Sequence, residues 1–61
     1  MNDTLVEIIE NDEYYYYTFI NMPKGMRIGL VVTVAVDNNI SFNDFSADEV
    51  VGMLLDKFEI V

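Results

Sequence analysis

The side chains best able to do chemistry in this chain are carboxylates, and their most regular set lies near the C-terminus. Asp48, Asp56 and Glu59 fall on one side of a predicted helix. Glu49 flanks this row, and Gly52 leaves a gap in it where another molecule could approach closely. Carboxylates at positions i and i+4 stand about 6 Å apart along a helix axis, similar to the phosphate spacing along one nucleic-acid strand. We call Asp48, Glu49, Asp56 and Glu59 the acidic row; it is either a solvated helix face or a phosphate mimic that binds a basic site on another protein.

Catalysis has little support in the sequence. Cysteine and histidine are absent, which removes the most common nucleophile, the most common general base and the usual zinc ligands. Ser41 and Ser46 have no neighbouring base to activate them. Pairs of carboxylates are able to act as acid and base, but in so acidic a chain they also arise by chance. We therefore predict a protein that is not an enzyme, with no catalytic residue and no cofactor.

The segment 37–45 (DNNISFNDF) compares with the second half of an EF-hand calcium loop, with Asp44 as the last ligand. In that alignment the first two ligand positions fall on Thr33 and Ala35, and no helix is expected before the loop. A short motif outside its structural context has a high false-positive rate. We therefore predict an ordinary polar loop over Asp37–Asp44 and no metal site.

Length and charge limit the remaining classes of protein. Residues 1–61 form a single small domain, and eleven acids against three bases give a net charge of −8. This charge disfavours direct binding to nucleic acid or to an anionic membrane. The chain has no signal-peptide pattern and no apolar run long enough to span a bilayer, so we expect a cytoplasmic protein. Without disulfides or metal, association is the remaining way to strengthen so small a core.

Three segments rich in β-branched and aromatic residues are typical of strands, with turns at Asn11-Asp12 and at 23–25. The predicted fold is α+β, a three-stranded antiparallel β-meander followed by one C-terminal helix (β-β-β-α). The predicted strands are Thr4–Glu10, Tyr14–Asn21 and Met26–Val36.

The predicted helix runs from Ala47 to about Phe58. Ser46 and Glu49 have the spacing of a capping box, in which each side chain bonds the other residue's backbone N–H. Phe45 before this cap would pack against Val50, four residues after the cap, as a hydrophobic staple. The start of this helix is the clearest local signal in the chain.

The predicted sheet has apolar side chains on both faces, and one helix is able to cover only one of them. The second face would be an exposed apolar patch, which marks an interface. We therefore predict a homodimer or larger oligomer, although a different strand register would make the tyrosines simple surface residues. The predicted oligomer contact consists of Tyr15, Tyr17, Phe19 and Val31.

The helical segment from Ala47 to Lys57 and the tyrosine cluster after an acidic turn resemble the small acidic uracil-DNA glycosylase inhibitors of Bacillus phages. The resemblance covers about a third of the residues. It implies a dimeric protein built on a short antiparallel sheet with a helix, and a surface that imitates DNA. It implies no individual binding residue, and the segment Met26–Val36 has no counterpart in it.

Charge, size and resemblance together favour a small acidic inhibitor of the phage or mobile-element type. It would block a nucleic-acid-binding or host-defence protein, with the acidic row imitating DNA at a basic site. The alternative is a structural or regulatory subunit of a homo-oligomer, in which the acidity serves only solubility.

Overall fold

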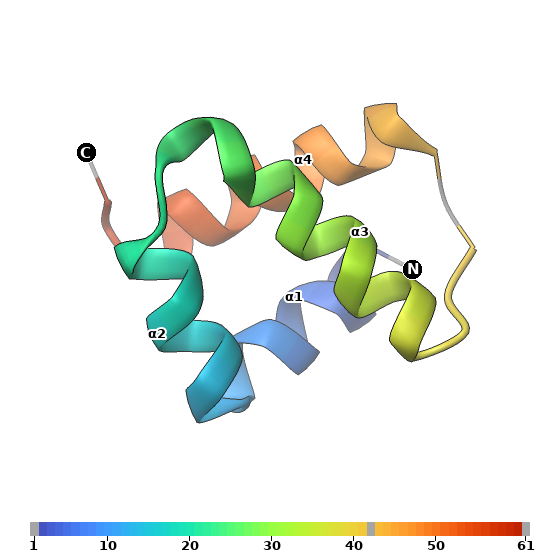
Figure 1. Cartoon of the computed structure of the whole chain (residues 1–61), viewed down its shortest axis with the longest axis horizontal. Helices are drawn as coiled ribbons and strands as arrows, with labels where there is room; N and C mark the ends of the chain where they lie inside the picture. The colour runs from blue at the N-terminus through green and yellow to red at the C-terminus, as the bar shows by residue number, and fades with distance from the viewer. Residues whose placement is uncertain (1, 42, 61) are drawn as a thin grey trace.

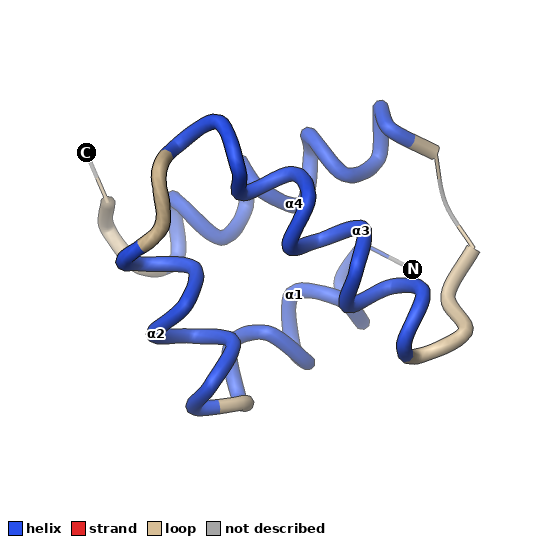
Figure 2. Tube along the Cα trace, in the orientation of Figure 1, coloured by secondary structure: helices blue, strands red, loops and turns tan. Residues whose placement is uncertain are grey.

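The computed structural model describes residues 2–41 and 43–60, and every regular element within those ranges is a helix (Figures 1 and 2). Four α-helices follow one another, with one turn of 3-10 helix between the second and third. In chain order they are α1 (Asn2–Asn11), α2 (Glu13–Asn21), η1 (Lys24–Met26), α3 (Arg27–Asp37) and α4 (Asp44–Lys57). The prediction of a β-meander is therefore wrong, and only its C-terminal helix is confirmed.

Each predicted strand lies within helical structure. Thr4–Glu10 belongs to α1, Tyr14–Asn21 to α2, and Met26–Val36 to the end of η1 and to α3. The physical reason is that β-branched and aromatic residues lose at most about 0.7 kcal/mol each in a helix relative to alanine. Burial of an apolar stripe outweighs this small preference. The stripe of α1 is Leu5, Val6 and Ile9, all buried.

The predicted turn at Asn11-Asp12 is a junction between two helices. Asp12 has an extended backbone and is the N-cap of α2, where its carboxylate accepts a hydrogen bond from the backbone N–H of Tyr15 at 3.0 Å. An N-cap aspartate satisfies one of the unpaired N–H groups at a helix start, and it suits the positive end of the helix dipole. The same residue type serves turns and caps, so the local signal was ambiguous.

Helix α4 begins three residues before the predicted start at Ala47. Its N-cap is Asn43, whose Oδ1 accepts hydrogen bonds from the N–H of Ser46 at 2.9 Å and from the Ser46 hydroxyl at 3.0 Å. The predicted cap, Ser46, is thus inside the first turn of the helix. The Phe45 side chain, for which packing was predicted, is not among the described side chains.

Helices α3 and α4 end in the same backbone motif. After α4, Glu59 takes a left-handed conformation (φ 55°), its N–H bonds the carbonyl of Asp56, and the N–H of Ile60 bonds the carbonyl of Leu55. After α3, Asn39 (φ 57°) and the residue following it make the equivalent bonds. This Schellman pattern turns the chain sharply and satisfies the last carbonyls of each helix.

The core lies between α1, α3 and α4, because α4 packs against both of the other two (Figure 1). Helix α2 packs on α1 and contributes Phe19, which is fully buried. Among the described residues, the buried apolar side chains are Leu5, Val6, Ile9, Phe19, Val31, Val34, Ala35, Ala47, Val50 and Leu54. None of the described helices is long and apolar enough to cross a membrane.

Arg27, at the start of α3, is the buried charged residue of the described chain, with 6% of its surface exposed. Its Nε donates to the carbonyl of Phe19 at 3.0 Å and its Nη2 to the carbonyl of Ile20 at 3.2 Å. Its guanidinium carbon also lies 4.9 Å from the centre of the Phe19 ring. Arg27 therefore holds the last turn of α2 against α3, and its positive charge faces the negative end of the α2 dipole.

Candidate functional site

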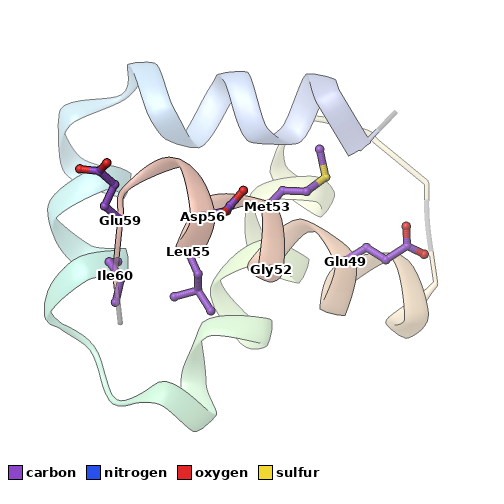
Figure 3. Close-up of a pocket in the computed structure, with 7 residues that line it drawn as sticks. All are labelled: Glu49, Gly52, Met53, Leu55, Asp56, Glu59 and Ile60. Carbon is purple, nitrogen blue, oxygen red and sulfur yellow. The ribbon is translucent and has the colours of Figure 1, made fainter.

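The acidic row lies along α4 and the turn that follows it, and Figure 3 shows three of its members. Asp48, Glu49 and Asp56 are exposed on the helix. Gly52 between them is exposed too, and a side chain added there would meet nothing within 4 Å. Glu49, Gly52 and Asp56 border a shallow, open depression, whose other lining residues are Met53, Leu55, Glu59 and Ile60.

Glu59 differs from the prediction, because it lies outside the helix. Helix α4 ends at Lys57, and Glu59 occupies the left-handed turn that follows. Its side chain is nevertheless exposed and borders the same depression as Asp56 (Figure 3). The turn thus places Glu59 at the same depression as Asp56, although Glu59 was assigned to the acidic row from a helical spacing that does not apply to it.

Helix α1 adds a second line of carboxylates that the sequence analysis missed. Asp3, Glu7 and Glu10 are spaced i, i+4 and i+7, so they fall on one side of α1. Both helices run from right to left in Figure 1, and Lys57 of α4 donates to the Glu10 carboxylate at 3.1 Å where they end. The Glu10 end of this line of carboxylates therefore lies beside the end of α4. We call these three carboxylates and the acidic row together the acidic face.

Most of the net charge of the protein lies on α1, α4 and the turn after α4, the segments that carry the acidic face. Residues 2–11 and 44–60 hold eight of the eleven acids and one of the three bases, which accounts for seven of the eight net negative charges. Such a one-sided distribution attracts a basic partner over a distance of about 8–10 Å at physiological salt.

The predicted oligomer contact is divided between surface and core. Tyr17 is 56% exposed and Tyr15 is half-buried. Phe19 and Val31 are fully buried within the single chain. Their inclusion in an interface was therefore wrong, because the core of the chain already covers them.

The outer side of α3 contrasts with the acidic face. No charged residue occurs between Arg27 and Asp37, and the exposed apolar side chains there are Ile28 (39%) and Val36 (68%). The Thr33 hydroxyl donates to a backbone carbonyl of its own helix at 2.9 Å. The molecule thus has an acidic side and an uncharged side.

The segment compared with a calcium loop is divided between two helix ends. Asp37 is the last residue of α3, and Asn43 is the N-cap of α4. Within residues 2–41 and 43–60, no three carboxylates converge closely enough to hold a metal ion.

Comparisons with models of protein families, with curated proteins and with solved structures gave no match. The sheet-and-helix fold implied by the resemblance to glycosylase inhibitors is not the fold of the described chain. The acidic face, with its position and charge, is therefore the main basis for a functional proposal.

Proposed function

We propose that this chain is a small acidic inhibitor that covers a basic, nucleic-acid-binding site on another protein with its acidic face. The observation that carries the proposal is the concentration of seven of the eight net negative charges on α1, α4 and the turn after α4. Surfaces that bind nucleic acid use lysine and arginine to neutralise rows of phosphates. Two adjacent lines of carboxylates offer such a surface a similar pattern of charge.

The geometry of the two helices supports mimicry of the two phosphate backbones of a nucleic-acid duplex. Carboxylates one turn apart, such as Asp3 and Glu7, stand about 6 Å apart along their helix axis. Packed helices lie about 8–10 Å apart, so the lines of carboxylates on α1 and α4 are separated by a distance of that order. The gap at Gly52 gives a partner side chain close access to the backbone of α4.

The uncharged outer side of α3 argues against the alternative in which the acidic residues serve only to keep the protein soluble. Charges that only keep a protein soluble work best when they are spread over its surface. Here they are concentrated on one side, while α3 has none from Ile28 to Val36. A one-sided field orients the molecule as it approaches a basic partner and raises the association rate.

The test uses a partner captured from host lysate on the immobilised chain and then purified. We expect its association rate with the chain to fall steeply with salt, and double-stranded DNA to compete for binding. Asp56→Lys should weaken binding about tenfold or more, because it reverses a charge in the middle of the acidic row. Asp37→Lys is the matched control, since it makes the same exchange at an exposed position outside the acidic face. Equal affinities for the two variants, with no salt dependence, would refute the proposal.

Self-association is a second candidate function, favoured by the uncharged side of α3. Two chains of charge −8 repel each other least where no acids face one another. Sedimentation of the wild type as a dimer, together with dissociation by Val36→Lys, would support an oligomeric subunit. A stable 7.0 kDa monomer at micromolar concentration would exclude it.

A further inference from the structure

A second, smaller hollow lies between α4 and the start of α3, on the other side of Leu55 from the acidic row. Its volume is about 160 Å³, and its lining consists of Lys24, Arg27, Val51, Leu55 and Ile60. Figure 3 shows Leu55 and Ile60 extending from α4 and its final turn toward this region. Two of the three basic residues in an otherwise acidic chain therefore border one small apolar cavity.

The Arg27 guanidinium is fixed in place before any ligand arrives. Its buried position, two carbonyl acceptors on α2 and the Phe19 ring restrict its motion. A group held in its bound geometry loses little conformational entropy on binding. Among the described residues, no carboxylate lies within ion-pair distance of this guanidinium.

The hydrogen bonds of Arg27 use only part of its donor capacity. A guanidinium has five N–H donors, and Nε–H with one N–H of Nη2 forms one edge of the plane. That edge donates to the carbonyls of Phe19 and Ile20. The second edge, formed by Nη1 and the other N–H of Nη2, matches the two oxygens of a carboxylate.

We propose that this cavity binds a carboxylate that carries a short apolar group. The carboxylate pairs with Arg27 and Lys24, and the apolar group packs against Val51, Leu55 and Ile60. Pockets for drug-sized ligands measure about 300–1,000 Å³, so this smaller space suits one amino-acid side chain or a short acyl chain. The ligand is either the C-terminal residue of a peptide or a free short-chain acid.

Titrations followed by two-dimensional ¹H–¹⁵N NMR test the proposal, with hexanoate and N-acetyl-leucine as probes. We expect saturable shifts of the Val51, Leu55 and Ile60 amides and of the Arg27 side-chain Nε. N-acetyl-leucinamide, which lacks the charge, and acetate, which lacks the apolar group, should give no saturation. Tighter binding of N-acetyl-leucine indicates a peptide C-terminus as the natural ligand, and tighter binding of hexanoate indicates a free acid.

Variants distinguish binding at this cavity from a general electrostatic attraction of anions to the protein. Lys24→Gln removes an exposed charge at the cavity and should weaken binding about threefold, as expected for one solvent-exposed pair. Lys57→Gln removes the same charge on the side of α4 that faces α1, and it should leave affinity unchanged. Val51→Phe should fill the cavity and abolish binding.

The proposal is overturned if the amide probe shifts the same signals as the acid, if inorganic phosphate does so equally well, or if the two lysine variants behave alike. The titration needs no partner protein, so its outcome is independent of the function proposed above. Asp56→Lys, which should disrupt that function, is expected to bind both probes at least as well as wild type.

Discussion

Replacement of Arg27 by alanine is expected to remove a large share of the stability of the fold. The substitution removes two hydrogen bonds donated by a charged group, each worth about 1.5–3 kcal/mol, and a ring contact worth about 0.5–2 kcal/mol. Removing the guanidinium also removes the cost of burying its charge, so the net loss is about 3–5 kcal/mol. For a chain of this length the total free energy of unfolding is about 3–9 kcal/mol.

The assay is thermal and urea unfolding followed by circular dichroism at the helical wavelength. At about 4–8 °C per kcal/mol for so small a domain, the melting temperature of Arg27→Ala should fall by about 15 °C or more. Arg27→Lys keeps the charge but lacks the planar fork that reaches both carbonyls, so about half of that loss is expected. Lys57→Ala is the control, because its ion pair to Glu10 is exposed and worth about 0–1 kcal/mol.

Two results would refute the reasoning about Arg27. A loss below about 1 kcal/mol, equal to that of Lys57→Ala, would mean that the carbonyls of α2 find other partners at no cost. A melting temperature of Arg27→Lys equal to that of wild type would mean that the charge at the end of α2 matters and the fork does not.

Five further substitutions test the helix ends and the core by the same unfolding assay. Glu59→Gly should raise the free energy of unfolding by about 1 kcal/mol, because glycine takes the left-handed conformation without strain. Asn39→Gly should give a smaller gain, since asparagine already tolerates the left-handed conformation. Leu54→Ala should cost about 2–5 kcal/mol, because Leu54 is fully buried, whereas the neighbouring, partly exposed Met53→Ala should cost under about 1 kcal/mol. Asp12→Ala should cost about 1 kcal/mol through loss of the α2 cap, and a melting curve unchanged from wild type would contradict that role.

The C-terminal helix could be predicted because two independent signals agree there. Val50 and Leu54 are apolar residues one helical turn apart and both are buried, and cap-forming residues precede the helix. Its start was misplaced because Asn43 and Ser46 are both good caps three residues apart. Local chemistry does not choose between such candidates.

The other helices were predicted as strands because the preference of β-branched and aromatic residues for strands was given more weight than the spacing of the apolar residues. Val31, Val34 and Ala35 are buried at positions i, i+3 and i+4, the period of a helix face. Read as a strand, the same segment showed apolar residues on both sides, which is a poor fit to a sheet covered by one helix. That misfit was itself evidence for helices, because a helix needs only one apolar side.

The candidate site was only partly accessible from the sequence for the same reason. The acidic row was found because α4 was recognised as a helix, whereas Asp3, Glu7 and Glu10 share a side only when α1 is helical. Arg27 had no local signal, since its acceptors lie seven and eight residues earlier on a different helix. Contacts of that kind depend on how the helices pack.

The helical fold also changes the basis on which self-association is to be judged. The predicted oligomer followed from a second apolar sheet face, and the described chain has no sheet. Phe19 and Val31, which that face would have exposed, are covered by the chain's own helices. The remaining reason for a dimer is the uncharged side of α3, where Val36 is the most exposed apolar residue. The response of sedimentation to Val36→Lys therefore decides between an oligomeric subunit and a monomer that acts through its acidic face.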